Sequence, residues 1–302
     1  MIGIRFRLEF VLLTFFIHTA QYIRGRFRRY LSIFLGLFAF DILRIRRAVS
    51  LSNMKLVFGD RLTTPEMISL GRKTYISLAH RAFELCDLTS MTKKEIVKRC
   101  NVEHWDRLED ALSRGRGAIL AAGHIGNWEL LAASIPARGV PVSAVAARMK
   151  NPLVNRWITD VRSRYGISLI GRGRYSARHI LRALSKNQCV LLLIDQDARN
   201  RGVFVPFLGT PASTRAGAAT LAQRARCPII PVTIRPETDT VHTVTFHRSI
   251  DPPDRGVSED AIIDTLRCIH TELERCIMAD PSLWFWPHRR FKTKPPPKER
   301  KE

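Results

Sequence analysis

Short apolar runs alternate with stretches of helical periodicity between residues 118 and 234, and this alternation limits the possible folds more than any other feature. Each run has the length and composition of a strand that is buried on both faces. Because a helical stretch separates consecutive runs, they can become parallel neighbours in one sheet. The chain is therefore predicted to be an α/β protein with a mainly parallel sheet flanked by helices. The apolar runs are 118–122, 142–146, 167–170, 190–194 and 229–234, and the helical stretches are 128–137, 152–165, 175–186 and 214–226.

Further elements are predicted on both sides of this region. Thr64 is a candidate N-cap, with Pro65 at the first position of a helix over 65–86. Ser258 is similarly a candidate N-cap, at the start of a long helix over 258–278. A helix over 103–114 and an edge strand over 241–246 complete the prediction.

The predicted α/β domain covers residues 51–291 and is large enough to bury a substantial core. Residues 292–302 are rich in Pro and Lys. This composition predicts a disordered basic tail.

Two apolar segments edged by arginines precede the α/β domain. They cover 8–23 and 30–43, and arginines cluster at 24–29 and 44–47. Neither segment reaches the length of uninterrupted apolar sequence that spans a bilayer. Apolar helices edged by arginines are typical of interfacial elements attracted to anionic lipid, and a pair of buried core helices is the alternative. Residues 1–50 are therefore expected to form a membrane-associating helical segment.

The formal net charge of +22 indicates an anionic partner, which could be nucleic acid, a membrane surface or a phosphorylated substrate. No zinc-finger spacing, RNP-type aromatic block or helix-turn-helix signal supports nucleic acid, and nucleic acid would leave the apolar segments unexplained. Residues 148–186 hold ten Lys or Arg and one acid, and residues 199–235 hold six Arg and no acid. These two stretches are expected to surround an anionic substrate site, with a generic solvated face as the alternative.

A histidine, His124, follows the predicted strand 118–122 after a single glycine, at the end of the strand where ligands bind in open α/β sheets. Glu129 follows His124 by five residues, in the first turn of the next helix, and Asn127 is a candidate cap of that helix. A turn between them could let the Glu129 carboxylate reach the imidazole. Such a contact fixes one ring nitrogen and leaves the other free as a base. An ordinary surface pair is the alternative.

Polar residues also follow the predicted strand 190–194. Asp195 and Asp197 either belong to an active site or form a loop cap or a salt bridge to the arginines that follow. Thr214 and Arg215 open a predicted helix, and a helix N-terminus beside an arginine is a ready anion site. An ordinary capped helix is the alternative there.

The spacing of His124 and Glu129 resembles the H-x4-D/E signature of the glycerolipid acyltransferase superfamily. The surrounding sequence His-Ile-Gly-Asn-Trp-Glu resembles the lipid A late acyltransferase branch, which includes the Kdo2-lipid A lauroyl- and myristoyltransferases. Other segments resemble this branch in the same order, so that the resemblance extends over most of the chain. These segments are Ile170-Gly171-Arg172, Asp195-Gln196-Asp197, 203–209, 228–232 and 284–290.

The resemblance implies a glycerolipid-acyltransferase-like fold and an enzyme that moves a fatty acyl chain from an acyl carrier protein thioester to a hydroxyl of a lipid A precursor in lipopolysaccharide biosynthesis. In that reading His124 is the general base, and Glu129 stabilises the imidazolium. Arg172 stabilises the oxyanion or binds a substrate phosphate. The expected substrate-binding residues are Asn127, Asp195, Asp197, Thr214 and Arg215.

A related acyltransferase that uses acyl-CoA and another glycolipid or phospholipid acceptor, such as phosphatidylinositol mannoside, is the alternative. The expected partners are acyl carrier protein or acyl-CoA, an anionic glycolipid and the membrane surface, without nucleic acid. No cofactor is expected, and the histidines show no metal-ligand spacing such as HExxH. Trp284 and Trp286 suggest either an interfacial anchor or plain packing. The expected location is the cell inner membrane, with the catalytic domain on the cytoplasmic side.

Overall fold

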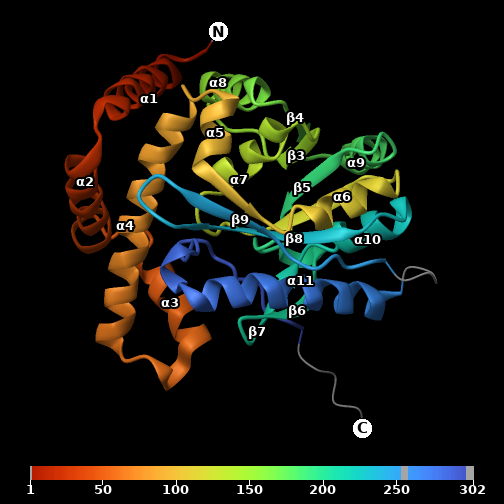
Figure 1. Ribbon diagram of the computed structural model, residues 1–302. Coiled ribbons are helices and arrows are strands. Elements are labelled where there is room, and N and C mark those ends of the chain that lie inside the picture. Colours follow the sequence, from red (N-terminus) through yellow and green to blue (C-terminus); the bar gives the residue numbers. More distant parts are fainter. Residues whose placement is uncertain (1, 253–257, 297–302) are drawn as a thin grey trace.

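The computed structural model describes residues 2–252 and 258–296, and a seven-stranded sheet lies at its centre (Figure 1). The sheet strands are β1 (Cys100–Glu103), β2 (Ala118–Ala122), β3 (Val142–Ala146), β4 (Ile167–Gly171), β5 (Cys189–Leu193), β8 (Ile229–Pro236) and β9 (His242–Phe246). Their spatial order is β1-β9-β8-β2-β5-β3-β4. The neighbours from β8 to β4 are parallel, whereas β9 is antiparallel to β8 and parallel to β1. The prediction of a mainly parallel α/β sheet is confirmed.

Helices cover both faces of this sheet. Along β2, Ile119 and Ala121 pack into one core with α9, α10 and α11, and Leu120 packs into a second core with α6, α7 and α8. Burial on both faces explains why these strands read as continuous apolar runs. The α-helices are α1 (Ile4–Tyr22), α2 (Gly25–Leu37), α3 (Arg47–Phe58), α4 (Thr64–Leu88), α5 (Lys93–Arg99), α6 (Asp106–Ser113), α7 (Trp128–Ser134), α8 (Pro152–Arg164), α9 (Ser176–Leu184), α10 (Gly217–Ala225) and α11 (Glu259–Ala279).

Several predicted boundaries were wrong. The N-cap of α4 is Thr63, which forms a capping box with Glu66, so that Thr64 is already helical. The first residues of the predicted helix 103–114 complete or follow β1, and α6 begins at Asp106. Strand β9 lies between β1 and β8 rather than at the edge. An antiparallel hairpin, β6 (Val203–Phe207) and β7 (Thr210–Thr214), precedes α10, and this helix therefore begins later than predicted.

The N-terminal helices α1 and α2 lie along the outside of α4 (Figure 1). Close approach of α2 depends on Gly36, because a Cβ at this position would come within 2.5 Å of the Ile76 backbone nitrogen. The guanidinium of Arg28 binds Asp87 of α4 through two hydrogen bonds of 2.6 and 2.8 Å. A short π-helix, Phe38–Ile42, continues α2.

Much of the apolar surface of α1, α2 and the π-helix faces outward, although Ile17 and Ala20 of α1 pack against α4. Among the described residues, none of the helices combines the length and the apolar character needed to cross a bilayer. The exposed large apolar side chains are Ile2 before α1, Ile4, Leu8, Val11, Leu12, Phe15, Phe16 and Tyr22 of α1, Phe27, Tyr30 and Phe34 of α2, and Phe38, Ile42, Leu43 and Ile45 after it.

Part of the predicted tail can be placed. In its described part, Thr293 donates a hydrogen bond to Asp197 Oδ2 at 2.9 Å. Residues 297–302 of that prediction lie outside the described residues.

Candidate active site

His124 lies at the carboxyl end of β2, in the loop that leads to α7. Gly126 in this loop has φ +55°, and a Cβ there would meet the carbonyl oxygen of Ile234 at 2.4 Å, so only glycine fits. The loop also bonds to the C-terminal segment. The Phe285 N–H donates to the His124 carbonyl oxygen, and the Gly126 N–H donates to the carbonyl oxygen of Leu283, each at 3.1 Å. The loop that carries the histidine is therefore held on both sides.

The strand order places Asp195 beside His124. Ala122 of β2 pairs with Leu193 of the neighbouring β5, and two further residues on each strand lead to the histidine and the aspartate. Asp195 Oδ1 lies 2.7 Å from His124 Nδ1, and Oδ2 accepts the His124 backbone N–H at 2.7 Å. The Trp284 indole N–H also donates to Oδ2, at 2.9 Å. Asp195 is only 2% exposed, so these donors replace its water.

Burial and charge act in opposite directions on the pKa of this pair. Burial lowers the pKa of His124, but the Asp195 carboxylate outweighs it and leaves the pKa above the ordinary 6.5. Burial likewise raises the pKa of Asp195, but the imidazole and the hydrogen bonds hold it well below its usual range. Asp195 is therefore ionised at neutral pH and accepts a hydrogen bond from the Nδ1–H group of His124. Gln196 places its amide nitrogen 3.2 Å from His124 Nε2, which matches a donor facing an unprotonated nitrogen.

Glu129 is oriented differently from the prediction. Its carboxylate accepts two hydrogen bonds from Arg162 of α8, at 2.6 and 3.1 Å. Among the described residues, the carboxylate that bonds to the His124 ring belongs to Asp195 rather than to Glu129. The Glu129 charge still raises the pKa of His124, so it acts on the ring through space. The predicted contact between Glu129 and His124 was wrong because Arg162 binds that carboxylate.

Asn127 is confirmed as the N-cap of α7. Its side-chain oxygen accepts the Leu130 N–H at 3.0 Å, and its amide nitrogen donates to Glu84 Oε2 at 3.0 Å. The residue is 5% exposed, and both ends of its amide bond to protein atoms. Asn127 therefore stabilises the loop between β2 and α7 through both ends of its amide.

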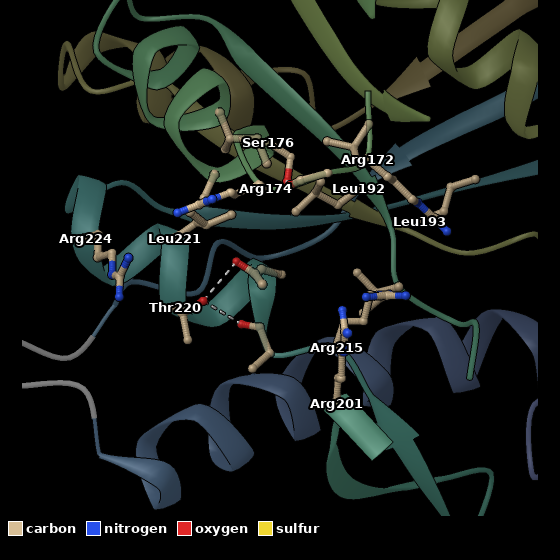
Figure 2. A pocket seen from close by; sticks show the side chains of 18 residues that line it. Arg172, Arg174, Ser176, Leu192, Leu193, Arg201, Arg215, Thr220, Leu221 and Arg224 are labelled. Carbon is tan, nitrogen blue, oxygen red and sulfur yellow. Dashed lines mark hydrogen bonds between the residues drawn. The ribbon is translucent and has the colours of Figure 1, made fainter. Parts of the chain in front are cut away.

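A pocket of about 830 Å³ adjoins this pair, since Ile194, the neighbour of Asp195, is part of its wall. Arginines and apolar side chains line it, and none of its described lining residues is acidic. Figure 2 shows Arg201 and Arg215 at one end and Arg224 at the other. The arginines are Arg172, Arg174, Arg201, Arg215 and Arg224, and the apolar residues include Val145, Ile180, Leu192, Leu193 and Leu221.

The structure brings two of the predicted site residues, Arg172 and Arg215, into this pocket. Burial, together with the charge of Arg215, lowers the pKa of Arg172. The charge of Arg172 in turn lowers the pKa of His124, so it reaches the candidate base. An anionic ligand would relieve the repulsion among these guanidinium groups.

Other predicted site residues support the loop after β5. Thr214 is fully buried at the end of β7, and its hydroxyl oxygen accepts a hydrogen bond from Arg290 Nη2 at 2.6 Å. Arg290 also donates to the Gln196 carbonyl oxygen at 3.1 Å, and burial lowers its pKa to about 10. The Asp197 backbone N–H donates a hydrogen bond to His288 Nε2, at 3.1 Å. The predicted helix N-terminus at Thr214 is thus wrong, because the hairpin ends there.

The C-terminal tryptophans pack inside the protein. Trp284 and Trp286 are 1% and 0% exposed, and their ring centroids lie 4.7 Å apart. Plain packing is therefore confirmed, and the interfacial anchor was wrong. Sequence reasoning missed the roles of Arg162, Gln196 and Arg290, although Gln196 lies between the two aspartates that it singled out.

Within 2–252 and 258–296, no group of three or more His, Cys, Asp or Glu side chains is arranged to hold a metal ion. Four of the cysteines, Cys86, Cys100, Cys189 and Cys227, are buried as free thiols.

Comparisons with known proteins identify relatives of this chain. The family model of the bacterial lipid A biosynthesis acyltransferases matches residues 10–293. A phosphatidylinositol mannoside acyltransferase from Mycolicibacterium smegmatis is 30% identical over 54% of this chain, and the match spans 55% of that protein, about half its length. A lipid A biosynthesis lauroyltransferase from Escherichia coli is 26% identical over 86% of this chain and 84% of its own length.

Among solved structures, the 1-acyl-sn-glycerophosphate acyltransferase PlsC from Thermotoga maritima aligns with 82% of this chain and 98% of its own, at 17% identity and a TM-score of 0.39. The family match extends over most of α1, all of α2 and the whole described sheet. The chain belongs to the family of bacterial lipid A biosynthesis acyltransferases and is an acyltransferase.

Proposed function

We propose that this enzyme transfers a fatty acyl group from an acyl carrier protein thioester to a hydroxyl of a lipid A precursor, with His124 as the general base. The observation that carries the proposal is the His124–Asp195 pair beside a pocket lined by five arginines. The pair offers a base for a hydroxyl, and the pocket offers charge and hydrogen bonds for the phosphate groups of an anionic glycolipid.

The acyl group passes directly from the thioester to the acceptor hydroxyl, so no acyl-enzyme forms. His124 Nε2 takes the proton of the acceptor hydroxyl as its oxygen bonds to the thioester carbonyl carbon. Asp195 stabilises the imidazolium that forms. In this proposal Arg172, which lines the pocket, donates to the oxyanion of the tetrahedral intermediate. The carbon–sulfur bond then breaks, and the imidazolium returns the proton to the departing thiolate. The products are an ester and a free thiol.

A second candidate is transfer from acyl-CoA to a phosphatidylinositol mannoside. The 30% identity to the mycobacterial acyltransferase supports it, although that match covers 54% of this chain, whereas the match to the lauroyltransferase covers 86%. A phosphorylated inositol lipid would also suit the arginine-lined pocket.

A transfer assay with purified full-length protein separates these candidates. Each donor, an acyl carrier protein or CoA thioester carrying dodecanoyl, tetradecanoyl or hexadecanoyl groups, is combined with a Kdo2-lipid A precursor or with a phosphatidylinositol mannoside. Mass spectrometry then detects the addition of one acyl group. We expect product from acyl carrier protein and the lipid A precursor. Product only from acyl-CoA and the mannoside would favour the second candidate, and no product from any pair would contradict both.

We further propose that the enzyme acts at the cell inner membrane with its catalytic domain on the cytoplasmic side. The outward apolar side chains of α1 and α2 suit the interface of a bilayer. Arg24, Arg26 and Arg29 are exposed beside them and can bind anionic headgroups. The same segment would bring a lipid acceptor close to the enzyme.

The double substitution Leu12→Asp and Phe15→Asp tests this membrane contact. Both side chains are at least 60% exposed, so the fold does not need them, but a bilayer would bury them. We expect the partition coefficient into phosphatidylethanolamine–phosphatidylglycerol vesicles to fall by more than about tenfold, measured by flotation. Met278→Asp, on exposed α11 surface, is the matched control and should float like the unmodified chain. Equal flotation of all three proteins would exclude α1 as the contact.

A further inference from the structure

Helix α4 directs two buried side chains of opposite charge toward the loop that carries His124. Arg81 and Glu84 stand three residues apart on this helix and are 9% and 5% exposed. Buried charges are unfavourable unless hydrogen bonds and opposite charges compensate for the lost water. The partners of these two side chains therefore show what the charges stabilise.

Arg81 joins the loop to the C-terminal segment. Its Nη1 donates to the carbonyl oxygen of Gly126 at 2.9 Å and to that of Leu283 at 2.7 Å. The Gly126 N–H also donates to the Leu283 oxygen, so the guanidinium closes a ring of hydrogen bonds. The guanidinium carbon of Arg81 also lies 5.8 Å from the centroid of the Trp128 ring.

Glu84 joins the same loop to the sheet. Its Oε2 accepts the Asn127 amide N–H at 3.0 Å, and its Oε1 lies 2.6 Å from His242 Nε2 on β9. His242 is 3% exposed. Burial raises the pKa of Glu84, but the hydrogen bond and charge of His242 outweigh it and hold the carboxyl below its usual range. An ionised Glu84 can accept from both neighbours at once.

We propose that Arg81 and Glu84 are positioning residues that set the place of His124 through Gly126 and Asn127. The inference rests on the proposed role of His124 as the base. The two α4 side chains contact the residues two and three positions after the histidine, whereas Asp195 contacts the histidine itself. Loss of either contact would let the loop move, and a displacement of about 1 Å can cost about 10²-fold in rate.

Asp87, one turn further along α4, provides a matched control. It is 8% exposed and binds Arg28 of α2 at 2.6 Å and Arg99 at 3.2 Å. Asp87→Asn and Glu84→Gln both replace a buried, paired carboxylate with an amide in the same helix. Of these two carboxylates, only that of Glu84 bonds to the loop that carries His124.

The experiment compares these two variants in the acyl-transfer assay, using the donor and acceptor that the unmodified chain accepts, and in thermal unfolding. We expect Glu84→Gln to lower kcat by about 10- to 100-fold with KM for the thioester changed less than about twofold. Asp87→Asn should lower Tm by a similar amount but keep kcat within about twofold. Arg81→Lys keeps the charge but ends one bond short of the Nη1 position that donates to both carbonyl oxygens, and it should resemble Glu84→Gln.

A double-mutant cycle separates positioning from general stability. Asn127→Ser keeps an oxygen acceptor at the N-cap of α7 and removes the donor to Glu84. If the two residues act as one unit, the double variant should lose no more kcat than the more affected single variant. If the kcat losses of the two single variants multiply in the double variant, the inference is overturned. Equal kcat in the Glu84 and Asp87 variants would also overturn it. Should Glu84→Gln not fold, the comparison of kcat and Tm between Arg81→Lys and Asp87→Asn decides the question.

His124→Asn distinguishes failure of the inference from failure of the proposed function. If it retains activity, His124 is not the base and the proposed function fails with the inference. If it is inactive while Glu84→Gln and Arg81→Lys keep full kcat, the inference alone fails.

Discussion

Replacing His124 with asparagine is expected to lower kcat by about 10²–10⁴-fold while the protein remains folded. Asparagine removes the ring nitrogen that would take the hydroxyl proton. Its amide can still donate toward Asp195 near the present position of Nδ1, which lies 2.7 Å from the carboxylate. The buried aspartate therefore keeps a donor, and the variant separates loss of the base from loss of a buried partner. Single-turnover transfer of a labelled acyl group measures the effect.

Two further variants serve as controls for this result. His124→Ala should be equally inactive but less stable, because it leaves Asp195 without its ring partner. Glu129→Gln should lose less activity than either His124 variant, because Arg162 rather than His124 binds that carboxylate. A His124→Asn protein with most of the original kcat would exclude the proposed base.

The position of the candidate base could be predicted from the sequence, but its partner could not. His124 follows an apolar run after one glycine, and a residue at that place lies at the carboxyl end of a strand. The choice of Glu129 as partner rested on nearness along the chain. Asp195 is 71 residues away in sequence and becomes adjacent only because β5 lies next to β2. Strand order depends on packing across the whole sheet, which local periodicity does not record.

The same distinction applies to the rest of the fold. Strands buried on both faces were predicted well, because their composition is apolar throughout. The β6–β7 hairpin was missed, and Thr214 was consequently assigned to a helix. The three charged groups Arg81, Glu84 and Arg290 are buried although their residue types usually lie at the surface. Only the tertiary structure shows the carbonyl oxygens and amides that compensate for their lost water.

The basic composition also divides into distinct parts of the structure. Arg28 is buried against Asp87, and Arg162 is paired with Glu129, so these charges stabilise the fold. Arg172 and Arg215 instead face a pocket without a described acidic neighbour in its wall. This difference supports a ligand site, rather than a generic solvated face, for the arginines around the pocket.

Replacing Asp195 with asparagine is expected to lower kcat by about 10³–10⁴-fold near neutral pH, as loss of the carboxylate partner does in other histidine-based sites. In the native protein Oδ1 faces Nδ1 and Oδ2 accepts two N–H groups, from the His124 backbone and from Trp284. An amide nitrogen cannot accept from that backbone group and that indole. To satisfy them its oxygen must face them, and the amide N–H then faces Nδ1. This arrangement favours the tautomer that carries the proton on Nε2. In that tautomer Nε2 has no free lone pair and cannot take the proton of the acceptor hydroxyl.

The pH dependence of kcat/KM tests the electrostatic part of this account. The base must be neutral, so activity should rise with pH through the raised pKa of His124. Without the Asp195 charge, burial is left to lower that pKa, and the residual activity of Asp195→Asn should rise at a lower pH than in the unmodified enzyme. Asp197→Asn is the matched control, because its side chain bonds to Thr293 rather than to the imidazole. If the profile of Asp195→Asn kept its native midpoint, or if Asp197→Asn shifted it equally, the charge of Asp195 could not be what raises the pKa of His124.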